Sequence, residues 1–257
     1  NDAAVALAEH VAGSESAFVE QMNHYAEQLG LENTHFENSE GLPAEEHYTS
    51  ARDVALLSRA IIREFPERYK RYAKREYTYN DIPQYNRNDL LWTNSGVDGL
   101  KTGYTEDAGY CLAASGERDG MRLISVVMGT PSEDARAADS RSLLAWGFRF
   151  YSTHRLYAAG EVLKEARIWQ GARDQVPLGL DHDLAVTIPK GEYERLEAKM
   201  SFPGRLVAPA EKGQELGTVR VEVDGETVAQ APLVALESVP EGGFFQQAVD
   251  TVIQWFQ

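Results

Sequence analysis

The residues best suited to chemistry form one short run, Lys101-Thr102-Gly103-Tyr104. An ammonium group and a hydroxyl on neighbouring residues can bind a carboxylate, because the lysine supplies positive charge and the threonine donates a hydrogen bond. Gly103 has no side chain to block backbone pairing with a ligand. The run therefore suits an extended anionic peptide. Taken alone it is a weak signal, since an exposed lysine before a strand-forming threonine is also an ordinary surface feature.

The neighbouring sequence predicts how this run is held. Two apolar segments, Tyr110–Ser115 and Arg122–Gly129, are joined by a turn that ends in Asp119-Gly120, which is the pattern of a β-hairpin. The run at Lys101 comes just before the first of these strands. We therefore expect Lys101 at a strand edge in the main cleft, with Thr102 and Arg136 facing the same space.

Three helices are predicted in the same part of the chain. Ser14 can cap a helix that ends at Gly30, Thr49 or Ser50 can cap one that ends before Pro66, and a third runs from Ser132 to Phe150. The side chains that we expect to be buried are Val54, Leu57, Ala60, Ile61 and Ile62 in the second helix, and Ala137, Leu143, Leu144, Trp146 and Phe148 in the third.

After Thr153 the pattern changes to short strands separated by turns, with a second hairpin turn at Asp224-Gly225. This favours a small antiparallel β domain, with its boundary near Tyr157–Gly160. The strands predicted there are Arg167–Trp169, Ala185–Ile188, Leu196–Phe202, Gly217–Val223 and Leu233–Leu236.

The composition excludes several classes of protein. The chain has 257 residues, and 40 acidic against 25 basic residues give a net charge of −15, which argues against nucleic acid and against electrostatic adsorption to anionic lipid. A hydrophobic content of 43% excludes global disorder. Apolar runs such as Leu123–Met128 are too short for a membrane-spanning helix. The single cysteine, Cys111, cannot form an internal disulfide.

The last segment has the pattern of an amphipathic helix. After Glu241-Gly242-Gly243, apolar residues recur at three- and four-residue spacing from Phe244 to Phe256, with glutamine and aspartate on the other side. Such a helix can dock on the β domain or lie in a membrane surface, and the pattern leaves both open. Without Lys or Arg on its polar face, any membrane binding would be hydrophobic.

The first residues read as a helix cap followed directly by a helix, Asn1-Asp2 and then Ala3 to Leu7. We therefore expect the domain to begin upstream of Asn1, and any targeting peptide to lie there as well.

Several further segments are similar to those of one family. With Lys-Thr-Gly, a signature motif of penicillin-binding proteins and class A β-lactamases, they resemble the low-molecular-mass penicillin-binding D-alanyl-D-alanine carboxypeptidases over the full length. Asn1 matches the asparagine of that family's second motif and lies 100 residues before Lys101, a similar spacing. The other matching segments are Val11–Ser14, Thr49–Asp53, Asn86–Asn88, Asn94–Gly103, Arg122–Met128, Trp146–Phe150 and Pro240–Phe245.

The resemblance implies an α/β (α+β) serine acyltransferase domain of the β-lactamase-like kind, incomplete at its N-terminus. It is followed by a small antiparallel β domain and a C-terminal amphipathic helix. Residues 1–157 are then the C-terminal portion of the catalytic domain, 158–240 the β domain and 241–257 a membrane anchor. The implied location is the periplasm, on the inner membrane.

The implied reaction removes the terminal D-Ala from peptidoglycan pentapeptide through an acyl-enzyme, and β-lactam antibiotics bind covalently at the same site. No cofactor or metal is implied. Asn1 would hold the substrate amide and help to move the proton, and Lys101 and Thr102 would bind the terminal carboxylate. The backbone N–H of Tyr104, after Gly103, would help to form the oxyanion hole.

Two arginines also match. Arg136 corresponds to a family arginine near the substrate carboxylate, and Arg87 to one that helps to order the site. A structural role is the alternative for each, and the functional role is the favoured one for Arg136.

The sequence departs from the family in two ways. No serine is followed three residues later by lysine, so the nucleophile, its lysine and the second-motif serine are expected upstream of Asn1. Tyr104 stands where the family often has histidine or a smaller residue, which leaves rate and substrate preference open. We expect the chain alone to be inactive and to expose apolar surface, unless a complementary N-terminal chain accompanies it.

Two alternatives remain. A class A β-lactamase needs a Glu-x-x-Leu-Asn element to deacylate, and Glu32–Leu42 contains none. A non-catalytic peptidoglycan-binding or scaffold module would have kept the fold and lost the chemistry. The intact Lys101-Thr102-Gly103 argues against that module, although only the upstream sequence decides.

Overall fold

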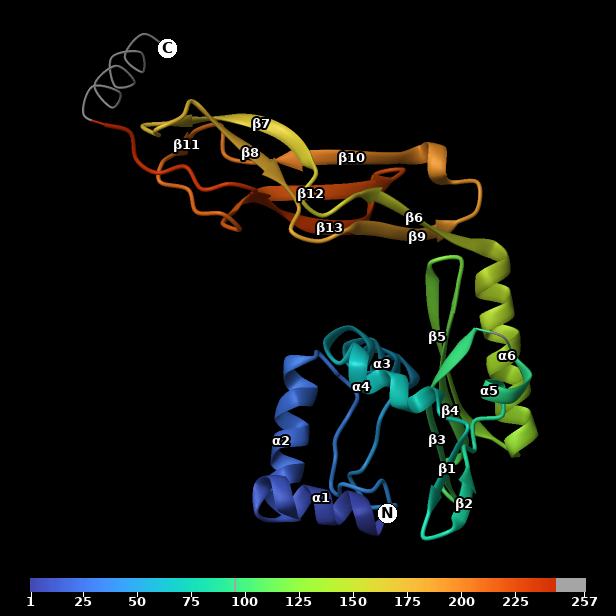
Figure 1. Cartoon of the computed structure of the whole chain (residues 1–257). Helices are drawn as coiled ribbons and strands as arrows, with labels where there is room; N and C mark the ends of the chain where they lie inside the picture. Colours follow the sequence, from blue (N-terminus) through green and yellow to red (C-terminus); the bar gives the residue numbers. More distant parts are fainter. Residues whose placement is uncertain (95, 244–257) are drawn as a thin grey trace. The chain divides into compact units, whose positions relative to one another are not determined.

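A computed structural model describes residues 1–94 and 96–243. The chain divides into two compact units, Asn1–Arg149 and Phe150–Gln257 (Figure 1). The first unit combines helices with a three-stranded sheet and carries the Lys-Thr-Gly motif. The described part of the second unit is built almost entirely of strands.

The first unit begins with two helices, α1 (Asp2–Ala12) and α2 (Glu15–Gln28). α1 ends at Gly13, whose φ of 83° lies in the left-handed region that glycine adopts without strain. Ser14 caps α2, since its Oγ accepts a hydrogen bond from the Ala17 N–H at 3.2 Å. The helix predicted between Ser14 and Gly30 is confirmed.

The next helix, α3 (Ala51–Glu64), is capped by Ser50, whose Oγ accepts from the Asp53 N–H at 3.1 Å. It is followed by α4 (Pro66–Tyr69) and the 3-10 turn η1 (Lys70–Ala73). The apolar stripe predicted on α3 is half-buried rather than fully buried. Its residues Val54, Ile61 and Ile62 pack against a cluster formed by Tyr69, Leu100 and Ala113.

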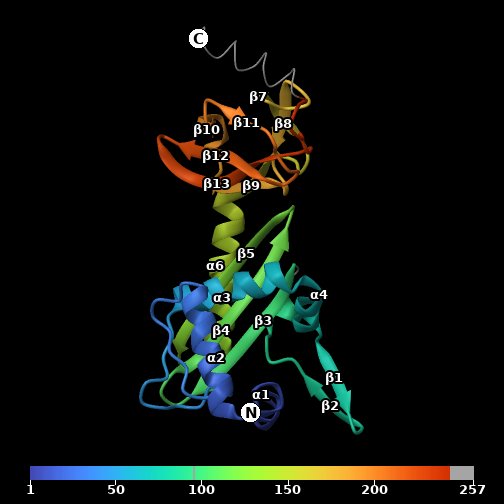
Figure 2. The same ribbon diagram turned by 90° about the vertical axis from the view of Figure 1, so that its left-hand side faces the viewer.

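The sheet of the first unit is antiparallel, with strand order β3 (Val97–Thr105), β4 (Gly109–Arg118) and β5 (Met121–Thr130). β4 and β5 form the predicted hairpin, and its turn residues Asp119 and Gly120 both have the positive φ of a tight hairpin turn. β3 is an edge strand that pairs with β4, with Lys101 opposite Ala113. In Figures 1 and 2, α3 covers one face of the sheet and α6 (Glu133–Phe150) the other.

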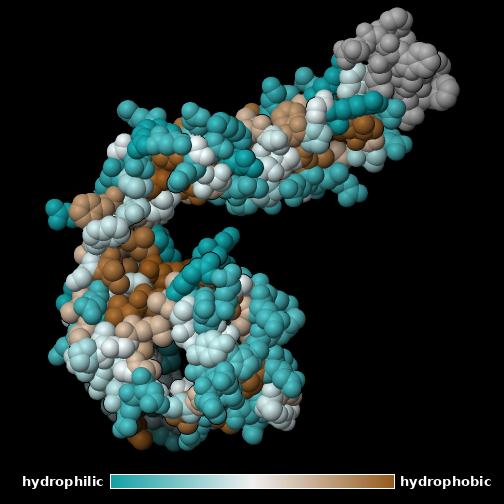
Figure 3. All heavy atoms as spheres, turned by 180° about the vertical axis from the view of Figure 1, so that it is seen from behind, coloured by the Kyte–Doolittle hydropathy of each residue, from teal (hydrophilic) through white to brown (hydrophobic). Residues whose placement is uncertain are grey.

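The buried side of α6 differs from the prediction. Ala137 and Leu144 are buried as expected, but Leu143 and Trp146 are 50% and 54% exposed. The reason is close packing: a Cβ placed on Gly147 would lie 2.5 Å from Leu123 Cδ1, so the helix meets the sheet through small side chains and its large apolar residues lie elsewhere. Seen from behind, hydrophobic residues gather over β5 and the adjoining α6 (Figure 3). The buried residues of α6 are Arg136, Ala137, Ser140, Leu144 and Gly147.

A hairpin that the sequence analysis did not predict precedes the sheet. It consists of β1 (Glu76–Tyr79) and β2 (Ile82–Tyr85), and its turn residues Asn80 and Asp81 have φ of 49° and 59°. Asn and Asp tolerate this conformation better than other non-glycine residues, which would have been the sequence signal. The short helix α5 (Leu90–Thr93) follows and leads into β3.

The second unit contains a six-stranded sheet and a two-stranded sheet. The six-stranded order is β10-β12-β13-β8-β7-β11, and β6 pairs with β9 in the other sheet. The strand bounds are β6 (Tyr151–Tyr157), β7 (Val162–Trp169), β8 (Gln175–Gly179), β9 (Leu184–Pro189), β10 (Leu196–Ser201), β11 (Leu206–Val207), β12 (Glu215–Val223) and β13 (Glu226–Ala235), with the 3-10 turn η2 (Tyr193–Arg195). Alternate residues of these strands, such as Val176, Leu178, Val219 and Leu233, form one buried core, so the predicted β domain is confirmed.

The division between the units lies eight residues before the predicted boundary after Tyr157. Tyr151–Tyr157 forms β6, whose partner β9 belongs to the second unit. The strand therefore belongs with the β domain rather than with the preceding helix.

The predicted amphipathic helix from Phe244 to Gln257 lies outside the described residues. Within 1–94 and 96–243, no helix is both long enough and apolar enough to cross a membrane.

Candidate active site

The Lys-Thr-Gly motif lies on the edge strand β3, as predicted. Lys101 is exposed, Thr102 is half-buried and Gly103 is exposed. A Cβ on Gly103 would have no atom within 4 Å, so the space above this residue is open to a ligand. Because successive strand residues point to opposite faces, Lys101 and Gly103 lie on one side of β3, and Thr102 and Tyr104 on the other. The expectation that Thr102 faces the same space as Lys101 is therefore wrong for the faces of the strand, and the two groups can meet one ligand only at the strand edge.

Arg136 is brought to this strand by α6. Its side chain is 3% exposed, and its Nη1 donates to the Gly103 carbonyl at 3.3 Å. Its Nη2 donates to the Arg87 carbonyl at 3.4 Å and pairs with Glu133 at 3.3 Å. The guanidinium carbon also lies 5.6 Å from the centre of the Tyr110 ring. Arg136 thus ties α6 and the Arg87 segment to the strand that carries the motif.

Arg87 is exposed and sits in a segment that its neighbours anchor. Asn88 is buried and its Nδ2 donates to the Gly99 carbonyl at 2.9 Å. Asn86 Nδ2 donates to the Tyr72 carbonyl at 3.3 Å and to the Lys74 carbonyl at 3.0 Å. The two asparagines fix the backbone on both sides of Arg87, so the Cα position of Arg87 is well defined.

These cations act on Lys101. Lys101 is exposed as a residue, but neighbouring groups remove part of the hydration of its ammonium, and this lowers the pKa of Lys101. The positive charges of Arg87 and then Arg136 lower it further. The Lys101 ammonium donates a hydrogen bond to the Thr102 carbonyl on its own strand. Three positive groups are therefore concentrated in a protein with a net charge of −15. An anion such as a carboxylate would relieve their mutual repulsion.

Tyr104 follows the motif on β3. Its side chain is exposed, and its ring centre lies 4.3 Å from that of Tyr110, the residue opposite it on β4. The ring therefore lies against the sheet. The assignment of its backbone N–H to an oxyanion hole stays a prediction.

Asn1 is not joined to the other predicted site residues by any described contact. It is exposed and begins α1, and its carbonyl accepts hydrogen bonds from the N–H groups of Ala4 and Val5. The structure therefore brings together Lys101, Thr102, Gly103, Arg136 and Arg87, whereas a role for Asn1 rests on the sequence alone.

The sequence analysis missed a half-buried polar network behind the motif. Arg122 of β5 binds both carboxylate oxygens of Asp98 on β3 at 2.8 Å, and its Nη1 also donates to Ser115 Oγ at 2.9 Å. The Tyr69 hydroxyl donates to Asp98 Oδ1 at 2.6 Å, and burial together with this bond raises the pKa of Tyr69. The network joins α4 to all three strands. The sequence feature that could have indicated this network is the acidic residue Asp98, three residues before Lys101 on the strand that carries the motif.

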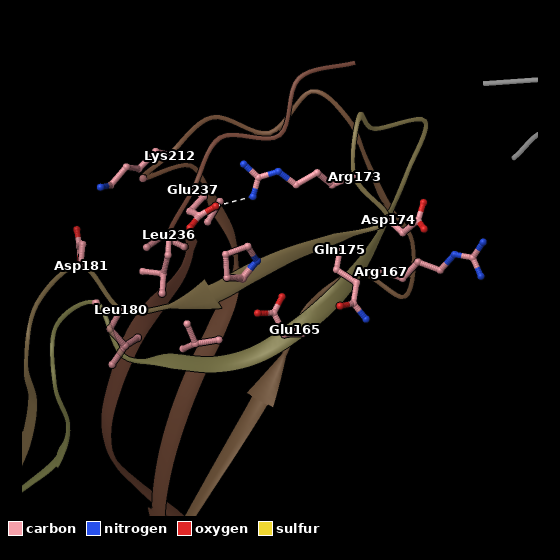
Figure 4. A pocket seen from close by; sticks show the side chains of 16 residues that line it. Glu165, Arg167, Arg173, Asp174, Gln175, Leu180, Asp181, Lys212, Leu236 and Glu237 are labelled. Atoms are coloured by element: carbon pink, nitrogen blue, oxygen red, sulfur yellow. Dashed lines mark hydrogen bonds and ion pairs between the residues drawn. The ribbon is translucent and has the colours of Figure 1, made fainter. Parts of the chain in front are cut away.

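A hollow in the second unit has a volume of about 1600 Å³ (Figure 4). Its wall carries charges of both signs, including an Arg173–Glu237 ion pair at 2.6 Å. None of the predicted site residues lines it.

Comparison with known proteins follows the two units. Residues 1–132 match the family described as D-alanyl-D-alanine carboxypeptidase, and residues 151–241 match the C-terminal domain of penicillin-binding protein 5. The chain belongs to the D-alanyl-D-alanine carboxypeptidase family. The fold expected from the resemblance, an α/β core followed by a β-rich domain, is confirmed.

Individual relatives agree with this assignment. The chain is 46% identical over 98% of its length to D-alanyl-D-alanine carboxypeptidase DacA of Escherichia coli, and it spans 63% of that protein. It is similar to the crystal structure of penicillin-binding protein 5 from Haemophilus influenzae, with 45% identity, a TM-score of 0.81, and coverage of 94% of this chain and 71% of that one. It is also similar to the ampicillin-bound form of penicillin-binding protein D2 from Listeria monocytogenes, with 35% identity, a TM-score of 0.54, and coverage of 58% and 62%.

Proposed function

We propose that this chain is the part of a serine-type D-Ala-D-Ala carboxypeptidase that binds the substrate carboxylate. The complete enzyme would remove the terminal D-Ala from peptidoglycan pentapeptide. The observation that carries this proposal is the concentration of positive charge from Lys101, Arg87 and Arg136 beside an open edge strand.

The edge strand suits the backbone of the peptide. An extended ligand can add to the free edge of β3 through main-chain hydrogen bonds. A terminal carboxylate that lies at this edge can then accept from the Lys101 ammonium on one side of the strand and from the Thr102 hydroxyl on the other. Open space above Gly103 allows the close approach that this pairing needs. A β-lactam carries a carboxylate on a compact amide framework and would use the same groups; the relative from Listeria monocytogenes binds ampicillin.

The nucleophile of this reaction is not among the 257 residues, because none of their serines begins a Ser-x-x-Lys motif. A segment outside this sequence would supply that serine. Its Oγ attacks the penultimate carbonyl, D-Ala leaves as the free amine with the transferred proton, and water then hydrolyses the ester. The contribution of this chain is to orient the substrate and to hold the leaving residue's carboxylate.

The test uses the protein that includes the nucleophile segment and a fluorescent penicillin. Lys101→Ala should slow acylation by about 100-fold or more. The substitution removes the ammonium group that we expect to bind the ligand carboxylate together with the Thr102 hydroxyl. Lys164→Ala on the exposed side of β7 is the matched control and should react at the parental rate. Equal acylation of the Lys101→Ala and parent proteins would exclude this role for the motif.

Peptide binding and acylation, measured together, separate an enzyme from a scaffold. A soluble peptide ending in D-Ala-D-Ala should bind to the chain, as measured by NMR shifts of the β3 amides. If the complete protein binds this peptide but is never acylated, the non-catalytic peptidoglycan-binding module becomes the correct interpretation.

We also propose that residues 244–257 attach the protein to a membrane surface, on the periplasmic side of the inner membrane. The support is the sequence pattern, since apolar residues recur at helical spacing and carry no Lys or Arg among them. Replacing Val252 and Ile253 with Asp should release the protein from vesicles, and parental binding should change little with salt. Unchanged co-sedimentation of the double variant would favour docking on the β domain.

A further inference from the structure

The β1–β2 hairpin presents an aromatic face to solvent. Tyr77, Tyr79 and Ile82 are 59%, 62% and 62% exposed, and every residue of both strands is exposed. Tyr79 pairs with Ile82, and Tyr77 with Gln84, so the side chains of these four residues share one face, named here the hairpin face. A two-stranded hairpin with no covered face is marginally stable alone, and aromatic side chains are enriched where proteins bind partners.

A basic hollow adjoins the hairpin face. It has a volume of about 560 Å³, and Arg71, Lys74 and Arg75 line it together with Tyr77 and Asn86. Glu76 is the one carboxylate among its lining residues. Within the described part of the chain, none of the three cations forms an ion pair; Arg75 instead lies 5.3 Å from the ring centre of Trp92. Unpaired cations in a strongly acidic protein indicate a ligand that carries negative charge.

The basic hollow and the motif are linked through the backbone at Asn86. Asn86 lines the hollow, and the next residue, Arg87, is the cation whose charge lowers the pKa of Lys101. The hydrogen bonds of Asn86 to the Tyr72 and Lys74 carbonyls hold the two places in a fixed relation. The cations of the hollow and Arg87 are therefore carried by stretches of backbone that Asn86 ties together.

We propose that the hairpin face and the basic hollow bind the polymer to which the substrate peptide is attached, a glycan strand whose side peptides carry carboxylates. Tyrosine rings can stack on the C–H faces of sugar rings while their hydroxyls hydrogen-bond to sugar hydroxyls. Arg71 and Lys74 would pair with carboxylates of side peptides. This inference rests on the proposed function and adds a second contact with the same polymer, away from the scissile bond.

The test is co-sedimentation of the 257-residue chain with purified, insoluble peptidoglycan. The pair Tyr77→Thr and Tyr79→Thr keeps the strand preference but removes both rings, and should weaken binding about tenfold or more, the loss of ordinary interface aromatics. Tyr25→Gln on α2 is the matched control, because this tyrosine is 62% exposed. The pair Arg71→Gln and Lys74→Gln should weaken binding and flatten its salt dependence. Arg59→Gln with Arg63→Gln on α3 makes the same charge change and should have no such effect.

Binding of a soluble D-Ala-D-Ala peptide is measured on the same variants. The hairpin and hollow variants should bind this peptide like the parent, which also shows that they are folded. Parental sedimentation of the Tyr77→Thr/Tyr79→Thr variant would overturn the inference while leaving the proposed function intact. Two other results would also overturn the inference. In these, the variant still binds peptidoglycan but loses binding to anionic vesicles, or loses self-association. Failure of the parent to bind the soluble peptide, with peptidoglycan binding still dependent on the hairpin, would count against the proposed function alone.

Discussion

At the scale of single residues, the site holds three positive groups together, and of these Arg136 is paired with a carboxylate, that of Glu133. The groups that depress the pKa of Lys101 are its own loss of hydration and two guanidiniums. Arg136 is tied by Gly103, the Arg87 carbonyl and Glu133, so it cannot move away. Such an arrangement is unfavourable in the free protein and becomes favourable when an anion arrives.

The first prediction concerns Arg87, the larger of the two electrostatic contributors. Arg87→Gln should raise the pKa of Lys101, because a neighbouring positive charge is removed while the backbone anchors at Asn86 and Asn88 remain. An NMR titration of the Lys101 side chain measures this. Arg59→Gln is the control and should leave the titration unchanged; a pKa of Lys101 that does not rise in Arg87→Gln would contradict the assigned cause.

The second prediction concerns Lys101 and folding stability. The pKa of Lys101 is lower in the folded protein than in the unfolded chain. Between these two pKa values the unfolded chain holds more protons than the folded protein, so the free energy of unfolding rises with pH across that interval. Below the folded pKa the charged lysine destabilises the fold. Lys101→Met should therefore be more stable than the parent at neutral pH, and the difference should shrink as pH rises toward the ordinary lysine pKa. Urea unfolding at several pH values measures it, and a difference independent of pH would contradict it.

At the scale of elements, a buried carboxylate holds the start of α3. Asp53 is fully buried, and its Oδ2 accepts from the Asn33 N–H at 2.7 Å and from Thr34 Oγ1 at 2.9 Å. Its own N–H is the one that Ser50 caps. One residue thus joins the helix to the loop before it, and a negative charge here also suits the helix N-terminus.

The third prediction follows from this contact. Asp53→Ala removes a buried charged acceptor from the Asn33 N–H and from the Thr34 hydroxyl, so we expect a loss of about 2–4 kcal/mol in the free energy of unfolding. Asp134→Ala, at an exposed position in the first turn of α6, should change stability by about 0.5 kcal/mol or less. Chemical denaturation measures both. Equal effects of the two substitutions would show that the Asp53 contacts are not stabilising.

Many ends of helices and strands could be predicted from the sequence, and the incorrect predictions share a physical cause. Ser14, Ser50 and Asp119-Gly120 predicted element ends correctly, because caps and tight turns depend on local residues. The buried side of α6 could not be predicted, because the close approach at Gly147 is decided by Leu123, a residue on a different element. The Asp98–Arg122–Tyr69 network was missed for the same reason: its members are distant in sequence and meet only after the sheet forms.

At the scale of the whole molecule, the two units have separate cores. The fourth prediction is that Leu178→Ala, which removes a fully buried side chain from the core of the second unit, destabilises that unit by about 2–5 kcal/mol. Unfolding of the first unit, followed by the NMR signals of the β4 amides, should be unaffected. Calorimetry should then show one transition that shifts and one that does not. A shift of the whole profile by the same amount would mean that the units unfold as one.

The free edge of β3 has a consequence for how molecules of this protein meet one another. A strand left open to accept a peptide can also accept the same strand of another molecule, which is how edge strands begin aggregates. Lys101 places a charge on that edge, with Arg87 and Arg136 beside it, so two such strands would bring like charges together. The groups that attract the substrate would then also keep the protein monomeric. Lys101→Met should raise the tendency to self-associate in light scattering, whereas Lys164→Met should not.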